Sequence, residues 1–251
     1  MSLFRRQDAS QSAGLSESLE LDLGGETVPV RIRRNGQARK LTLRVRAATR
    51  DVVLTTPPHV SLAAIFDFAN RHREWVHTRL GRLPDIVPFV AGAMVPLRGV
   101  PHRLIHEPDK RGTVWPGESD GDGPTLHVAG DEPHMARRVE DFLKREARQD
   151  LVEAVGRHAT ALEVKIGRIT LRDTASRWGS CSSRGDLSFS WRLILAPPLV
   201  LDYLAAHEVA HRLELNHSPR FWQLVEQIFP AREQAEAWLR MQGASLHRYG
   251  G

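Results

Sequence analysis

His207-Glu208-Val209-Ala210-His211, followed at Asn216-His217 by a further histidine, is the stretch that decides the fold and the chemistry expected of this chain. Residues four apart lie on one face of a helix, so His207 and His211 can present two imidazoles to one ion. Glu208 lies about one-third of a turn round the helix, beside a metal-bound water and not on the metal. The pattern predicts metal-assisted hydrolysis, in which the ion activates water and the carboxylate accepts a proton.

The residues around this motif predict a buried helix that begins at Pro197-Pro198. Asn216 is expected to end the segment in a left-handed conformation, and Ser218-Pro219 to begin the next helix. His217 then falls in the connection, where its ring can turn back to the ion. Three protein ligands with one open position are typical of a catalytic zinc.

Two alternatives stay open at this point. The histidines could be incidental residues of a core helix, although apolar helices rarely bury two histidines and a glutamate without partners. A glutamate from a later helix could replace His217 as the third ligand. The candidates are Glu226, Glu233 and Glu236.

A second segment, Ser176-Arg177-Trp178-Gly179-Ser180-Cys181-Ser182-Ser183, precedes a strand-like run over 187–195. Together with residues 207–222, these segments closely resemble the bacterial YgjP-like metallopeptidase family, relatives of the SprT-type zinc proteases. The resemblance extends from about residue 25 to the C-terminus and is most specific over 176–222.

The resemblance implies a zinc-dependent hydrolase with His207, His211 and His217 as ligands and Glu208 as general base. Some members of the family have been described as nucleotide pyrophosphatases, so a metal-dependent nucleotide phosphohydrolase is the alternative enzyme. The metzincin pattern has the same spacing of histidines, but Glu214 occupies the position of its turn glycine, and no methionine turn is recognisable.

Whole-chain properties are those of a globular protein: 251 residues, of which 41% are hydrophobic, with a single cysteine that excludes an internal disulfide. No run approaches the ~18 uncharged apolar residues of a membrane span. Residues 1–18 are expected to be a flexible leader without a secretory signal, and cytoplasmic residence is the default expectation.

The predicted fold is α+β: a zincin-like catalytic domain over 125–251 that contains the motif helix, and an N-terminal β-rich accessory region over 19–106. Hairpins are expected over 19–56, with turns at Gly24-Gly25 and Asn35-Gly36. The remaining expected elements are a helix from Ser61 to about Leu80, strands near 94–106, 125–128, 166–172 and 187–195, a loop from Trp115 to Pro124, and a long helix from Asp131 to about Leu162.

The run 187–195 alternates as a half-buried strand would, with Phe189 and Trp191 on its apolar face and Arg192 on the other. As an edge strand it could pair with an extended substrate; as a central strand it could not. Arg177, Phe189 and Trp191 are the candidate substrate-binding residues. Arg177 could stabilise an oxyanion or anchor a carboxylate.

Two further residues have alternative roles. Cys181 could be a nucleophile or fourth ligand, but a lone cysteine is more often a small buried hydrophobe. Tyr203, one turn before His207, could support that ligand or only pack in the core. Core packing is the expectation for Tyr203.

A basic stretch without acidic residues runs from Arg31 to Arg50 in a chain of net charge +5 and isoelectric point about 10.0. Such a stretch can bind phosphate backbones, although arginines that alternate with apolar residues usually form the wet face of a sheet. The sequence therefore predicts a cytoplasmic zinc metallopeptidase that cleaves a peptide or protein substrate by a Glu208-activated, zinc-bound water. The alternative outside enzymes is a nucleic-acid-associated protein with a structural zinc; the oligomeric state is not specified.

Overall fold

The computed structural model describes residues 17–46, 49–83, 85–117, 121, 123–174 and 177–250. The chain forms two compact units, residues 1–83 and 84–251, each with its own apolar core. Strands predicted within 94–106 belong to the second unit, so the boundary lies at Leu83 and not after residue 106. Most of the expected leader, residues 1–16, lies outside the described residues.

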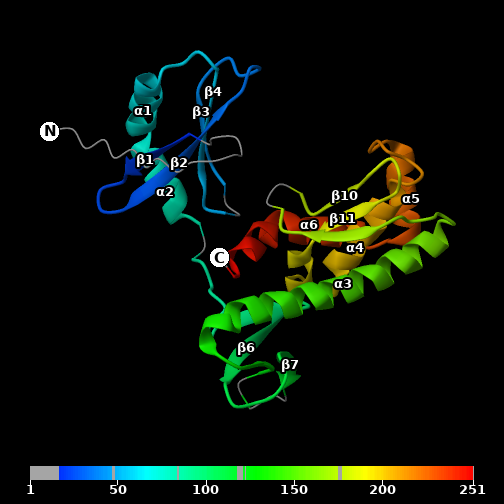
Figure 1. The fold of residues 1–251 in the computed structure, drawn as a ribbon. Helices are drawn as coiled ribbons and strands as arrows, with labels where there is room; N and C mark the ends of the chain where they lie inside the picture. Colours follow the sequence, from blue (N-terminus) through cyan, green and yellow to red (C-terminus); the bar gives the residue numbers. More distant parts are fainter. Residues whose placement is uncertain are drawn as a thin grey trace. The chain divides into compact units, whose positions relative to one another are not determined.

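The first unit is a four-stranded mixed sheet with two helices (Figure 1). Its elements are β1 (Ser18–Asp22), β2 (Thr27–Arg34), β3 (Thr42–Val45), β4 (Val52–Thr56), α1 (Leu62–Arg71) and α2 (Arg73–Gly81). Gly24 and Gly25 have positive φ in the β1–β2 turn, as that predicted hairpin requires. Asn35-Gly36 does not join a hairpin, because β4 lies between β2 and β3 and pairs in parallel with β2.

Ser61 caps α1 as predicted, since its hydroxyl accepts the amide of Ala64 at 3.3 Å. The expected single helix is divided at His72 into α1 and α2. In the basic stretch, Arg34 forms an ion pair with Glu17 and donates to two backbone carbonyls of the same unit. At least this arginine therefore has a structural role.

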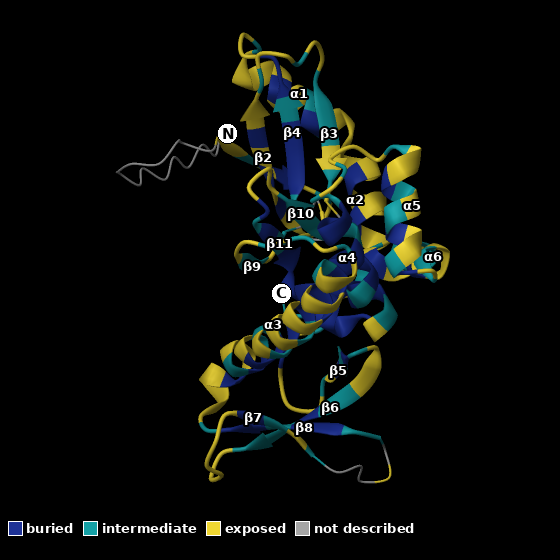
Figure 2. Ribbon diagram, turned by 90° about the vertical axis from the view of Figure 1, so that its right-hand side faces the viewer, coloured by how far each residue is buried: buried dark blue, intermediate teal, exposed yellow. Residues whose placement is uncertain are grey.

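The second unit begins with a four-stranded sheet in the order β5-β6-β8-β7, followed by a long helix. The elements are β5 (Met94–Leu97), β6 (Val100–Glu107), β7 (Val114–Gly117), β8 (Thr125–Ala129), the 3₁₀ turn η1 (Glu132–His134) and α3 (Met135–Ala161). The expected loop from Trp115 thus starts inside β7. The predicted long helix is confirmed as α3. Figure 2 shows that one side of α3 is exposed and the other is buried.

A small sheet follows in the order β10-β11-β9: β9 (Ile169–Arg172), β10 (Gly179–Cys181) and β11 (Leu187–Ser190). The predicted strand 187–195 is wrong beyond Ser190, because Trp191–Leu195 form the 3₁₀ turn η2, in which all five residues are buried. Ser190 starts the turn by accepting the amide of Arg192. Since β11 is the central strand, the edge-strand alternative does not hold for it; β10 and β9 are the two edge strands.

Arg192 consequently points inward, although strand alternation placed it on a solvent face. Its guanidinium forms an ion pair with Asp173 at 2.7 Å and donates to the carbonyls of Leu246 and Tyr249. These contacts join η2 to the C-terminal 3₁₀ segment η3 (Gly243–Arg248). In a 3₁₀ turn, side chains do not alternate between two faces as they do in a strand, so Arg192 is not directed to solvent. Four hydrogen bonds stabilise its buried positive charge.

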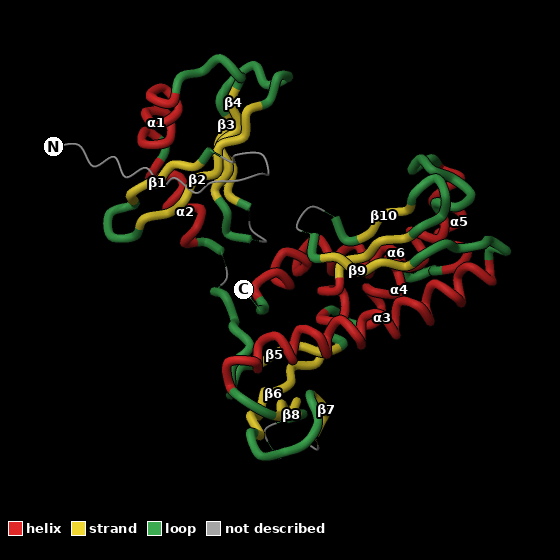
Figure 3. The backbone as a smooth tube through the Cα atoms, viewed as in Figure 1, coloured by secondary structure: helices red, strands yellow, loops and turns green. Residues whose placement is uncertain are grey.

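Three helices complete the unit: α4 (Pro198–Ala210), α5 (Pro219–Ile228) and α6 (Arg232–Gln242). Helix α4 contacts α3, α5, α6 and β10, and most of its residues are buried. In Figure 3, α3 and α4 lie on one side of the small sheet. The architecture is α+β, and no helix in the described part of the chain is long and apolar enough to cross a membrane.

Candidate metal centre

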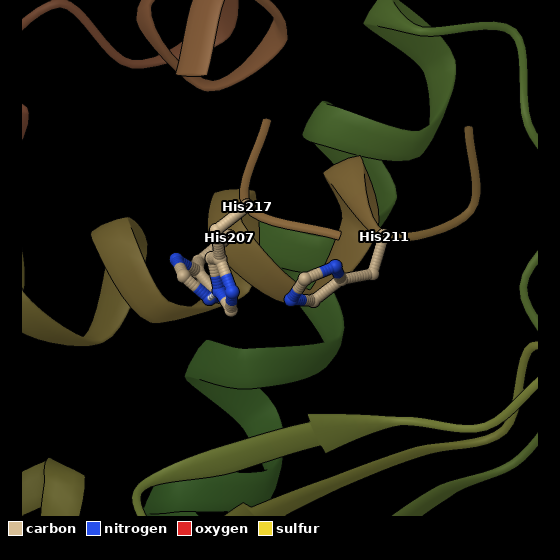
Figure 4. Close-up of side chains that lie close together, drawn as sticks. All are labelled: His207, His211 and His217. Carbon is tan, nitrogen blue, oxygen red and sulfur yellow. Dashed lines mark hydrogen bonds between the residues drawn. The ribbon is translucent and has the colours of Figure 1, made fainter. Parts of the chain in front are cut away.

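Three histidine side chains meet where α4 ends. His207 lies in the last turn of α4, His211 is its C-terminal cap, and His217 lies in the connection to α5. The Nε2 atoms of His207 and His217 are 3.1 Å apart, and one donor atom from each histidine lies within 4.8 Å of the others. In Figure 4 the rings of His207 and His217 lie together, and the ring of His211 is turned toward them. Within the described ranges, no other set of three or more histidine, cysteine or acidic side chains brings its ligand atoms this close together.

The chain reaches this arrangement by ending α4 earlier than predicted. The amides of Arg212 and Leu213 bond to the carbonyls three residues back, those of Val209 and Ala210, so the last turn tightens and the helix ends at Ala210. Asn216 does not have a positive φ, so the predicted left-handed stop is wrong. Ser218 starts α5 as expected by accepting the amide of Phe221 at 3.3 Å. The turn therefore spans 211–217 and places His217 opposite His207.

Burial keeps the imidazoles of His207 and His211 neutral. It lowers the pKa of His207 to about 3 and that of His211 below its usual value, and the neighbouring histidines add to both effects. The ring of Phe221, itself fully buried, stacks on His211 with 4.4 Å between centroids. Neutral imidazoles retain the lone pair that a metal ligand needs.

The donor set fits a divalent ion that prefers nitrogen. Nitrogen ligands at about 2.0–2.1 Å from a tetrahedral zinc lie about 3.3 Å from each other, close to the 3.1 Å that separates His207 and His217. Nδ1 of His211 lies 3.0 Å from the carbonyl oxygen of Glu214; this contact engages Nδ1 and leaves Nε2 as the nitrogen available to a metal. The geometry thus suits zinc better than an oxygen-seeking magnesium.

Glu208 lies beside this cluster with only 4% of its surface exposed. Burial raises the pKa of its carboxyl to about 8, and the positive charge of Arg177 opposes the effect. A cation held by the histidines would lower that pKa further, because it favours the charged form. Gly179 of β10 packs directly against the Glu208 side chain. Glu208 is therefore held between the helix and the edge strand.

The predicted substrate-binding residues separate into two groups. Arg177 is exposed and lies near Glu208, whereas Phe189 and Trp191 each expose 1% of their surface and belong to the core. The prediction that Phe189 and Trp191 contact substrate is wrong, because both side chains are buried. Cys181 is half-buried, burial raises the pKa of its thiol, and it is not part of the histidine cluster. Ser176, the first residue of its motif, lies outside the described residues.

Tyr203 and Glu236 form a polar link behind His207 that the sequence does not predict. The Tyr203 hydroxyl donates to Oε1 of Glu236 at 2.7 Å and lies 3.4 Å from Nδ1 of His207. Arg232 lies 3.5 Å from the same carboxylate. A hydrogen on Nδ1 of His207 would point at the tyrosine oxygen, so the link favours the tautomer that leaves Nε2 free.

The competing glutamates have other positions. Glu226 forms an ion pair with Arg232 at 2.8 Å, and Glu233 is exposed in the first turn of α6. Glu236 supports Tyr203 and is not solvent-facing as expected; its side chain is 26% exposed. No glutamate belongs to the cluster of donor atoms within the described part of the chain.

Residues 39–242 match the family model described as YgjP-like, metallopeptidase domain. This chain belongs to the YgjP-like metallopeptidase family. The crystal structure of the metallopeptidase zymogen of Pyrococcus abyssi abylysin matches with a TM-score of 0.33 and 20% identity, over 37% of this chain and 92% of that chain. A search of curated proteins finds no match.

The family match supports a metal-dependent peptidase. It implies a divalent metal, and the three histidines are a group that could bind one. The resemblance read from residues 176–222 is thereby confirmed at the level of the family.

Replacement of Gly179 by alanine should impair this YgjP-like site without unfolding it. A Cβ atom there would lie 2.4 Å from Oε1 and 2.8 Å from Cδ of Glu208, so the flexible carboxylate must move. If Glu208 is the general base, kcat/KM should fall about a hundredfold, while metal content is unchanged. Gly156→Ala in α3 is the matched control, because its added methyl group would meet nothing within 4 Å beyond its chain neighbours and the backbone of its own helix. Equal activities of the two variants would contradict the proposed contact.

Glu236→Gln should weaken metal binding, because the amide is a poorer acceptor for the Tyr203 hydroxyl that orients His207. Losing such a supporting contact typically costs about tenfold or more in metal affinity. Competition with a chromogenic chelator measures the affinity. Tyr203→Phe should have a similar effect, and Glu233→Gln, exposed on the same helix, should have none. Unchanged affinity in both Glu236→Gln and Tyr203→Phe would show that the link does not act on the ligand.

Proposed function

We propose that this protein is a zinc metallopeptidase in which His207, His211 and His217 hold the ion and Glu208 is the general base. The observation that carries the proposal is the meeting of three imidazoles beside one buried carboxylate. When bound, zinc would polarise the scissile carbonyl and lower the pKa of water toward 7. The family supports peptidase chemistry, and the all-nitrogen donor set supports zinc.

Glu208 serves the reaction through proton transfer. Its carboxylate accepts the proton of the attacking water and then delivers it to the nitrogen of the leaving amine. The low exposure of Glu208 excludes competing solvent and strengthens its interactions with charges that develop nearby. Its placement against Gly179 restricts the directions in which the carboxylate can turn.

Strand β10 is the element best placed to align an extended substrate. The amide of Ser190 bonds to the carbonyl of Trp178, and the amide of Ser182 bonds to the carbonyl of Asp186. Alternation along an antiparallel pair then directs the backbone groups of Gly179 and Cys181 to the open edge. An added peptide strand would use these groups and run past Glu208. The role first considered for 187–195 is thus proposed for 179–181.

His217→Ala should lose zinc while Glu226→Ala retains it. Removing one of three ligands weakens zinc by orders of magnitude, whereas Glu226 already pairs with Arg232 away from the cluster. Elemental analysis after dialysis against a weak chelator gives the metal content, expected to be about one zinc per wild-type chain. Retention of zinc by His217→Ala together with its loss from Glu226→Ala would replace this ligand set by one with a glutamate.

Glu208→Gln should retain zinc and the native fold, but its kcat should be about 10²–10⁴-fold lower, which is the usual contribution of a general base. The variant and the wild-type protein should be compared on peptide, protein and nucleotide substrates. We expect the wild type to hydrolyse peptide or protein substrates and not nucleotides, and the variant to be slower on the same substrates. Nucleotide hydrolysis without peptide cleavage would reject the peptidase proposal, and equal turnover by both proteins would reject Glu208 as the base.

A further inference from the structure

The small sheet has a hollow on its outer face that the proposed chemistry does not use. A cleft of about 690 Å³ is lined by three arginines, a row of hydroxyl side chains and a single acid. It shares β10 with the candidate active site, since Gly179 lines the cleft and also contacts Glu208. Whatever occupies this cleft therefore lies beside the proposed catalytic groove.

Strand register builds the floor of the cleft. Ser180 of β10 pairs with Ser188 of β11, which pairs with Thr170 of β9, so three hydroxyl residues form one row across the sheet. Leu187 and Phe189, on either side of Ser188, are buried in the core. Because successive side chains alternate between the two faces, Ser188 and its row face away from the core.

Arginines lie at both ends of this row. Arg168 and Arg172 are each two residues from Thr170, so they share its face, and Arg177 lies on the loop that enters β10. Within the described ranges, neither the Arg168 nor the Arg172 side chain has a hydrogen bond or ion pair. Both guanidinium groups thus remain available to a ligand.

The single acid in the lining, Asp186, is held by the turn before β11. Its carboxylate accepts the amide of Arg168 at 2.8 Å, and its own amide donates to the hydroxyl of Ser182. Elsewhere in this unit, Arg98 and Arg192 are paired with carboxylates. The lining therefore carries three arginines and one acid, an excess of positive charge that favours an anionic ligand.

We propose that this cleft binds an acidic segment of the polypeptide substrate, an inference that rests on the proposed peptidase function. Guanidinium groups bind carboxylates through paired, charge-assisted hydrogen bonds, and the hydroxyl row supplies further donors. The open edge of β10 allows an extended backbone to continue from the cleft to Glu208. The described lining contains no aromatic ring on which a base could stack, which argues against single-stranded nucleic acid.

Binding to labelled peptides tests the inference directly. In zinc-loaded Glu208→Gln, which should not cleave, fluorescence anisotropy is measured with octaglutamate and with octaglutamine. We expect octaglutamate alone to bind, and salt to weaken it. Adding Arg168→Gln and Arg172→Gln together should weaken binding about tenfold, as expected for two lost charge-assisted contacts. The matched control is Arg137→Gln with Arg145→Gln, which removes the same charge from side chains that are 81% and 58% exposed on α3.

Cleavage kinetics separate this inference from the proposed function. Two peptides share one scissile sequence and differ in a tetraglutamate or tetraglutamine extension. The double arginine variant should raise KM about tenfold for the acidic peptide only, with kcat unchanged. If no peptide is cleaved but octaglutamate binding still requires both arginines, the cleft is supported and the peptidase function fails. If peptides are cleaved without acidic preference and the arginine changes have no effect, the cleft inference fails. Tighter arginine-dependent binding of oligothymidylate than of octaglutamate would overturn it in favour of nucleic acid.

Discussion

The burial of polar groups on α4 is the constraint on which the second unit depends. This helix contacts α3, α5, α6 and β10, and its core residues require that enclosure. Yet the same helix carries His207 and the 4% exposed Glu208, which cost free energy to remove from water unless partners are present. A divalent ion on the three histidines would supply such a partner for the carboxylate, so metal binding and stability of this unit should be coupled.

Local sequence signals predict the parts of the site that depend on adjacent residues. The i, i+4 spacing places His207 and His211 together, and Ser218 caps α5 and fixes where the connection ends. The long helix α3 also follows its predicted course because its period and its start signals agree over many residues. His217 meets the other two for the same reason: only a short turn separates it from α4.

Long-range contacts account for what the sequence could not specify. The alternation of apolar and polar residues over 187–195 does not reveal that a 3₁₀ turn begins after Ser190. That turn depends on distant groups, because Arg192 forms hydrogen bonds with Asp173 and with the C-terminal carbonyl of Tyr249. Glu236 lies 33 residues from Tyr203, and no local pattern links the two. The unit boundary at Leu83 was likewise hidden, since β5 and β6 resemble any other short strands in sequence.

Gly179 shows how the edge strand and the catalytic helix constrain each other. Its φ is not in the left-handed region, so backbone conformation does not require glycine there. The limited space around residue 179 does require glycine, because a Cβ atom there would clash with the Glu208 carboxylate. The same residue directs backbone groups to the open side of β10, where a substrate strand would lie. A larger residue would push the Glu208 carboxylate away from the position in which the proposed mechanism uses it. In the proposed mechanism the glycine therefore sets the distance between the substrate strand and Glu208, which would make the motif around it part of the site as well as of the fold.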